Sequence, residues 1–217
     1  MQKAVIPESP RILLVCATHH GSTTQVADAI ADELRGAGAD VDVQAAASAA
    51  GPEGFDAAVI GGPMIMGWHK DARRYVQRHG ERLATIPTAI FITAASLTED
   101  GKDQVQGVPI VKDPWLVKPP RAADKLGYRE RYALPSHYLG DVLKAAPGVR
   151  PAAAAFFAGV LDLTTMNLLE KVFVLLIIGA TPGDARNWKV IRGWARGLPA
   201  QLFDRHDGAS EGGVAAG

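Results

Sequence analysis

The sequence predicts a doubly wound α/β domain, with five parallel strands in one sheet, helices on both faces, and an insertion before the fifth strand. Short apolar runs without alternation are typical of parallel strands that are covered on both faces. Between them lie segments whose apolar residues recur three and four positions apart, as in amphipathic helices. Because the two kinds of segment alternate along the chain, we expect a doubly wound sheet.

The first half of the chain contains three of the expected strands and two helices. The strands are expected at residues 12–17, 41–43 and 57–60, where the residues are mostly apolar and partly β-branched. Apolar positions at helical spacing predict helices at residues 24–34 and 72–83. The first and third strands are therefore each followed by a helix, as in a doubly wound sheet.

The second half departs from this rhythm. A fourth strand is expected at residues 89–92, followed by an insertion at residues 98–136 that carries five prolines and no clear period. We expect loops and short helices there, and such long irregular segments are usually functional or mobile. Regular signals resume with a helix at 137–145, a fifth strand at 154–160 and a last helix at 190–198.

The length and composition limit the class of protein. The 217 residues fit a single domain, expected at residues 1–207, followed by a disordered tail at 208–217. Lys and Arg together number 23, as do Asp and Glu, so the overall charge does not indicate a nucleic-acid partner. The single cysteine, Cys16, allows no disulfide within the chain. Because we find no secretory signal and no apolar run long enough to span a bilayer, we expect a cytoplasmic protein.

A hydroxyl-rich loop between the first strand and the first helix is the strongest candidate for a binding site. Ligands of open parallel sheets bind at the carboxyl ends of the strands, and the unpaired N–H groups at a helix start stabilise an anion. Gly21 would let the backbone approach a phosphate, and the hydroxyls can donate to its oxygens. The candidate phosphate-binding residues are Thr18, His19, His20, Gly21, Ser22, Thr23 and Thr24. The alternative is ordinary N-capping by Ser22 or Thr23.

This loop resembles the flavodoxin signature T-x-x-G-x-T, in the expected place after the first strand. The wider pattern is most similar to the flavodoxin-like menaquinone-dependent protoporphyrinogen dehydrogenases. Besides segment 61–69, the residues that carry this resemblance are Phe55, Asp56, Tyr75, Val76, Ile86, Pro87, Phe157, Ala158, Gly159, Gly183, Asp184 and Trp188. The resemblance implies a flavodoxin-like fold over nearly the whole chain and an FMN cofactor whose phosphate lies in the first loop.

The resemblance also implies that two further loops, after strands three and four, grip the isoalloxazine ring. Their candidate residues are Pro63, Met64, Ile65, Met66, Gly67 and Trp68 in one loop, and Thr93, Ala94, Ala95, Ser96 and Leu97 in the other. The methionines and Trp68 offer apolar and aromatic faces for a planar ring, although they alternatively cover the edge of the sheet. The second loop has no tyrosine, so one face of the ring would stay open to a substrate or quinone.

The histidines of these loops have two interpretations. No carboxylate or cysteine joins His19, His20 and His69 at a metal-binding spacing, so we expect loop residues and no metal. His69 is a candidate proton donor because the pKa of histidine lies near physiological pH. The alternative is a solvated surface histidine.

These features together predict an FMN-dependent oxidoreductase, a dehydrogenase that passes electrons from an organic donor through FMN to a quinone or other acceptor. The flavin performs the transfer, so no catalytic triad is needed and no catalytic side chain is assigned. One alternative is a flavodoxin-type electron carrier, but such carriers are typically strongly acidic and this chain is neutral. The other is a flavin-free binding module, against which the intact loop argues.

Two segments bear on the partners. Lys118, Arg121, Lys125, Arg129 and Arg131 make the end of the insertion locally basic, and only Asp124 and Glu130 oppose them. Such a segment attracts an anionic donor, for example a porphyrinogen-like molecule, or anionic lipid headgroups, unless it is an ordinary solvated loop. The apolar stretch at residues 168–178 is either a core helix or a peripheral contact with the inner face of the membrane.

Overall fold

The computed structural model describes residues 8–19, 21–122, 125–161 and 183–203. The expected tail at 208–217, His20 and the apolar stretch at 168–178 lie outside the described residues. Among the helices that the structure describes, none is long and apolar enough to cross a membrane.

The five predicted strands form the parallel centre of one sheet. They are β1 (Arg11–Cys16), β2 (Asp40–Ala45), β3 (Ala57–Met64), β4 (Thr88–Ala94) and β9 (Ala153–Ala158). Their order across the sheet is β2-β1-β3-β4-β9, and every neighbouring pair is parallel. The predicted doubly wound fold class is therefore confirmed.

The sheet is wider than the five strands that we predicted. The insertion adds β7 (Val108–Lys112), parallel to β9, and β6 (Gln104–Val105), antiparallel to β7. It also supplies β8 (Val117–Lys118), which pairs with β5 (Leu97–Thr98) in a small second sheet. The sequence did not predict β7 because it contains Pro109, and proline within a sheet is found mainly in edge strands. The expected short helix is α3 (Tyr128–Tyr132).

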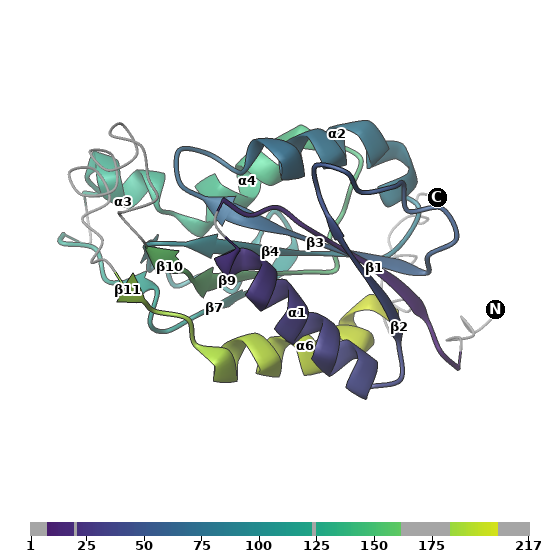
Figure 1. Ribbon diagram of the computed structural model, residues 1–217. Coiled ribbons are helices and arrows are strands. Elements are labelled where there is room, and N and C mark those ends of the chain that lie inside the picture. Colours follow the sequence, from purple (N-terminus) through teal and green to yellow (C-terminus); the bar gives the residue numbers. More distant parts are fainter. Residues whose placement is uncertain (1–7, 20, 123–124, 162–182, 204–217) are drawn as a thin grey trace, which may run out of the picture.

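In the described part of the chain, four longer helices cover the sheet, two on each face (Figure 1). One face carries α1 (Ser22–Gly36) and α6 (Trp188–Phe203), and the other carries α2 (Lys70–Leu83) and α4 (Pro135–Ala145). In β1, Ile12 and Leu14 pack in the core between the sheet and helices α1 and α6. Leu13 and Val15 pack in the core on the other face, against α2 and α4. This division explains why the strand is apolar at successive positions. A short antiparallel pair, β10 (Val160–Leu161) and β11 (Gly183–Asp184), follows β9.

A buried carboxylate fastens the insertion to the sheet. Asp113, immediately after β7, is fully buried, and one of its oxygens accepts the backbone N–H of Trp115 at 3.0 Å and the amide of Asn187 at 3.1 Å. Its other oxygen accepts the N–H of Ala158, the last residue of β9, at 3.2 Å. Hydrogen bonds to a charged group are the stronger kind, so Asp113 joins the end of β7 to β9 and to the start of α6.

We expect Asp113→Ala to lower the free energy of unfolding by about 3 kcal/mol, because the variant leaves buried N–H donors without an acceptor. Urea denaturation measures this difference. Asp103→Ala is the matched control, since it removes an exposed carboxylate from the same insertion and should change stability by less than about 0.5 kcal/mol. Equal effects of the two substitutions would contradict the assigned role of Asp113.

Candidate functional site

The three predicted loops meet at one edge of the sheet. The register places Cys16 of β1 beside Gly61 of β3, and Met64 of β3 beside Ala94 of β4, so the carboxyl ends of the three strands lie together. The hydroxyls of Thr23 and Thr93 are 3.1 Å apart and join the first loop region to the third. The rings of His19 and His69, with centroids 4.4 Å apart, join the first loop to the second.

The start of α1 has the properties of an anion site. Its N-cap is Gly21, whose φ of 83° lies in the left-handed region that glycine adopts without strain. No side chain caps the helix, and its first turn contains no acidic residue. The alternative of N-capping by Ser22 or Thr23 is therefore wrong, because both residues lie inside the helix. The first N–H groups of α1 thus keep the partial positive charge that attracts a phosphate.

The predicted hydroxyls have separate roles in the structure. Thr18 accepts the N–H of Gly21 at 2.8 Å and so shapes the loop. Thr23 is buried against Thr93, and the side chain of Thr24 hydrogen-bonds with the thiol of Cys16. Ser22 is the half-buried hydroxyl at the helix start for which the described residues supply no partner. It is therefore the hydroxyl best placed to donate to a bound anion.

Cys16 is a buried free cysteine. Burial raises the pKa of its thiol to about 12, against a smaller opposing effect of the Thr24 side chain. The thiol therefore stays protonated at neutral pH, and only the thiolate is reactive.

The second loop presents different side chains from those expected. Met64 and Trp68 are buried in the core, and Trp68 is only 2 % exposed, so it covers the sheet as in the alternative interpretation. Met66, by contrast, is 52 % exposed, and Ile65 is partly exposed. The apolar surface available to a planar ring in this loop therefore comes from Pro63, Ile65 and Met66. Gly67, with a φ of 106°, makes the turn between Met66 and Trp68.

The third loop is mostly buried. Thr93 and Ala94 end β4, and Leu97 begins β5 in the core, so Ala95 is the residue of the loop that reaches the surface. The hydroxyl of Tyr138 in α4 donates to the carbonyl of Ser96 at 3.2 Å and holds the loop in place. Contacts of this loop with a ligand would thus involve mainly backbone groups.

Tyr132 in α3 is a candidate site residue that the sequence did not reveal. Its hydroxyl donates to the carbonyl of Ile65 at 3.0 Å, so the insertion supports the second loop directly. The residue lies in a segment without periodicity, and no motif singles it out. Only the folded structure brings α3 to residues 63–68.

His69 is a buried residue and not the solvated surface histidine of the alternative. It is 8 % exposed, and its Nδ1 accepts the N–H of Asp71 at 3.2 Å, which caps α2. Burial lowers its pKa, and the neighbouring His19 lowers it further, while Asp71 opposes them. His69 is therefore neutral at neutral pH, and because Nδ1 accepts, its proton lies on Nε2. It borders a cavity of about 560 Å³ together with Arg73.

The remaining predicted residues stay untested as ligands of a cofactor, and His20 lies outside the described residues. Within the described part of the chain, no three His, Cys, Asp or Glu side chains are grouped as metal ligands would be.

The lowered pKa of His69 makes stability depend on pH. The unfolded chain binds a proton near pH 6.5, the ordinary value for histidine, and the folded chain only at lower pH. The stability that neutral His69 contributes is therefore present above this pH and lost as the pH falls toward the folded pKa. We expect His69→Asn, which retains a capping side chain, to flatten the decline of the unfolding free energy below about pH 6.5. His137→Asn should keep the wild-type slope, because it leaves His69 in place.

Comparison with known proteins places this site in a family. A model of the flavodoxin domain matches residues 13–187. Among solved structures, a flavodoxin from Streptococcus pneumoniae TIGR4 is 13% identical, with a TM-score of 0.45 and coverage of 88% of this chain and 99% of that chain. A Fusobacterium nucleatum flavodoxin bound to flavin mononucleotide is 11% identical, with a TM-score of 0.39 and coverage of 89% and 99%.

A putative quinone reductase from Klebsiella pneumoniae is 10% identical, with a TM-score of 0.43 and coverage of 88% of this chain and 85% of that chain. No curated protein matches. Since these structural scores lie below 0.5, the assignment depends on the domain model, which covers most of the chain and all three loops. The chain belongs to the flavodoxin domain family.

Proposed function

We propose that the chain is an FMN-dependent oxidoreductase that passes electrons from an organic donor through FMN to a quinone or other acceptor. The single observation that carries the proposal is the uncapped start of α1 at the edge where three loops converge. That arrangement provides one phosphate site beside two loops that can border a planar ring.

The residues present fit FMN, which is the cofactor expected of a flavodoxin domain. The N–H groups at the start of α1 and the hydroxyl of Ser22 would hold the phosphate. Ile65 and Met66 would border the ring, and the backbone of residues 93–97 would contact it from the other side. When bound, FMN supplies the hydride or electron transfer, and the protein supplies binding, orientation and electrostatics.

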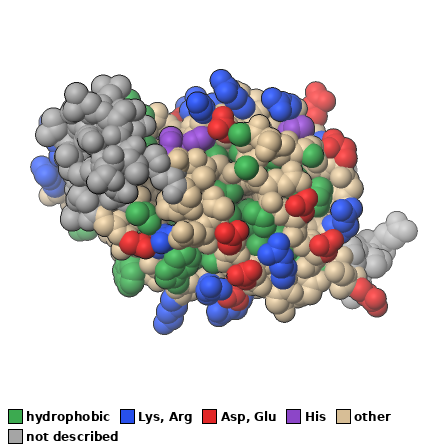
Figure 2. All heavy atoms as spheres, viewed as in Figure 1, with side chains coloured by type: hydrophobic (Ala, Val, Ile, Leu, Met, Phe, Trp, Pro, Cys, Tyr) green, Lys and Arg blue, Asp and Glu red, His purple; other side chains and the backbone are tan. Residues whose placement is uncertain are grey.

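The insertion supports an enzyme over an electron carrier. Its helix α3 holds the second loop through Tyr132, and the hydroxyl of Thr98, just after the third loop, donates to the carbonyl of Glu130 at 2.8 Å. The insertion therefore contacts both of the loops that we assign to the ring. On the face in Figure 2, cationic and anionic side chains are interspersed, which fits the zero net charge and differs from the acidic docking surface typical of carriers.

The finer proposal is an activity resembling protoporphyrinogen dehydrogenase, with a porphyrinogen-like anionic donor and a quinone acceptor. The resemblance along the sequence and the basic end of the insertion support it. A cytoplasmic location with peripheral contact at the inner membrane face would give access to quinone, and it is part of the same proposal.

Protein purified without added flavin is expected to be yellow. Acid treatment should release FMN and not FAD, because a single helix start offers a single phosphate site. The absorption spectrum and chromatography of the released flavin test this expectation. A colourless protein that takes up no added FMN would contradict the proposal, whereas a yellow protein that oxidises no organic donor would favour the carrier.

Replacing Thr18 and Ser22 together by alanine should weaken FMN binding by about tenfold or more. The Ser22 change removes a hydrogen bond to a charged group, which contributes on the order of 1.5–3 kcal/mol, and the Thr18 change removes the acceptor that shapes the loop at Gly21. Thr23 is left unchanged because its hydroxyl joins two loops through Thr93. Fluorescence titration of the apoprotein measures the dissociation constant. Ser48→Ala, at an exposed serine outside the three loops, should leave affinity unchanged. An unaltered constant in the double variant would place the phosphate elsewhere.

A further inference from the structure

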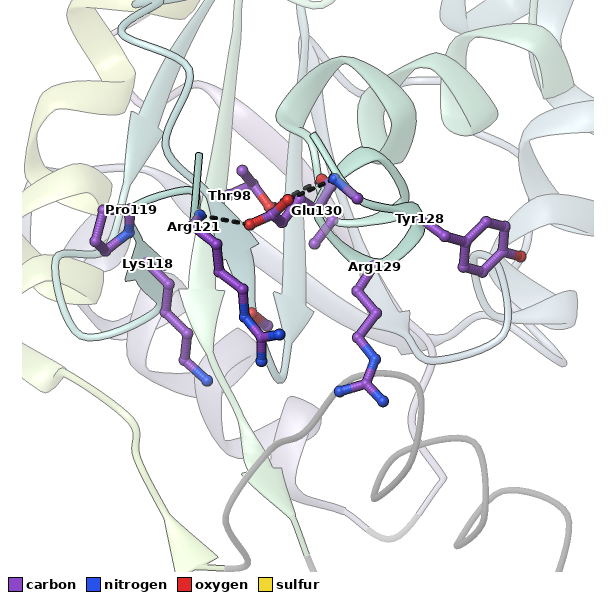
Figure 3. Close-up of a pocket in the computed structure, with 10 residues that line it drawn as sticks. Thr98, Lys118, Pro119, Arg121, Tyr128, Arg129 and Glu130 are labelled. Carbon is purple, nitrogen blue, oxygen red and sulfur yellow. Dashed lines mark hydrogen bonds between the residues drawn. The ribbon is translucent and has the colours of Figure 1, made fainter. Parts of the chain in front are cut away.

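A second cavity lies next to the third loop, between β8 and α3 (Figure 3). Its volume is about 480 Å³, within the usual range for small-molecule sites. Residues of the insertion between 118 and 133 line it, together with Ser96 and Thr98. Because Ser96 belongs to the third loop as well, a molecule in this cavity would lie beside the loop that we assign to the flavin ring.

The cavity is lined by three cations, Lys118, Arg121 and Arg129. Figure 3 shows their side chains extending in the same direction, whereas Tyr128 points away to the side. Among the described residues, the ion pairs at 4.0 Å or less include none of these three side chains; the charge of Arg121 adds to the lowering of the pKa of Glu130. Two of the five cations that make the segment basic in sequence do not line the cavity. They are Lys125 and Arg131, and Arg131 donates to the carbonyl of Leu126 at 2.9 Å.

Glu130, the acidic residue of the lining, has a structural role. Its two oxygens accept the backbone N–H groups of Arg121 at 2.6 Å and of Gly127 at 2.5 Å. These hydrogen bonds lower its pKa, so the carboxylate stays ionised. Glu130 thereby joins the two ends of segment 121–127 and fixes the backbone of Arg121 close to α3. The side chains of Arg121 and Arg129 keep their own donors for a ligand.

We infer that this cavity binds the carboxylate groups of a small organic polyanion through Arg121, Arg129 and Lys118. Arginine matches a carboxylate with two parallel hydrogen bonds, and several cations together favour a ligand with more than one carboxylate. A concave site can surround a small molecule, whereas a membrane surface is flat. We therefore favour a soluble anion over a lipid headgroup as the ligand. The inference deepens the proposed function, because the bound anion would be its electron donor.

The test is calorimetric titration of the purified holoprotein with benzene-1,3,5-tricarboxylate, and with the neutral tricarboxamide as a control probe. We expect the tricarboxylate to bind, the tricarboxamide not to bind, and added salt to weaken the binding. Arg121→Glu combined with Arg129→Glu should weaken it by about tenfold or more. Arg121→Gln with Arg129→Gln removes the two charges without reversing them and should also weaken the binding. This second variant keeps the test valid if the glutamate variant does not fold.

The matched control is Arg78→Glu with Lys102→Glu, which changes the net charge equally at exposed cations outside the cavity. It should bind the tricarboxylate like the wild type. Equal losses in the control and the cavity variants, absence of binding, or a preference for phosphatidylglycerol vesicles over the tricarboxylate would each overturn the inference. Flavin content measured on the same samples separates the two proposals. An anion-binding protein without FMN overturns the proposed function and the anion's role as electron donor but leaves the anion site, and a yellow protein that does not bind the anion overturns only this site.

Discussion

The parallel pairing of β1, β3 and β4 is the constraint on which the rest of the site depends. Parallel strands end at the same edge, so the loops after Cys16, Met64 and Ala94 must lie together. The hydrogen bond between Thr23 and Thr93 and the contact between His19 and His69 follow from that placement. The start of α1 then lies at the same edge with its N–H groups uncapped. Backbone geometry would stabilise an anion there, without a lysine in the loop.

Much of the fold could be predicted because strands that are buried on both faces of the sheet consist of consecutive apolar residues. All seven residues of β4 are buried, and such strands appear as unbroken apolar runs. The strand β7 was missed because Pro109 interrupts it and only part of it is buried. Asp113 was missed for a different reason: its partners Trp115, Ala158 and Asn187 lie in separate segments, and no local spacing indicates that they meet.

The candidate site was predictable at the level of loops more than of side chains. Residues 18–24 stood out because they follow a strand and precede a helix. Gly21 has the left-handed backbone conformation that lets a ligand approach the main chain closely. The direction of a side chain depends on tertiary packing, and so Thr23 and Trp68 turn inward while Ser22 and Met66 do not. Tyr132 and the cavity beside α3 could not be foreseen, because they arise where the insertion folds back onto the regions of the second and third loops.

The central claim is that the start of α1 holds the phosphate of FMN while the loops at 63–68 and 93–97 border its ring. A crystal structure of the chain with FMN tests this claim most directly. The account predicts phosphate oxygens that accept the N–H groups of the first turn of α1 and the hydroxyl of Ser22, with the ring between the other two loops. A phosphate bound at any other helix start, or a ring outside those two loops, would contradict it.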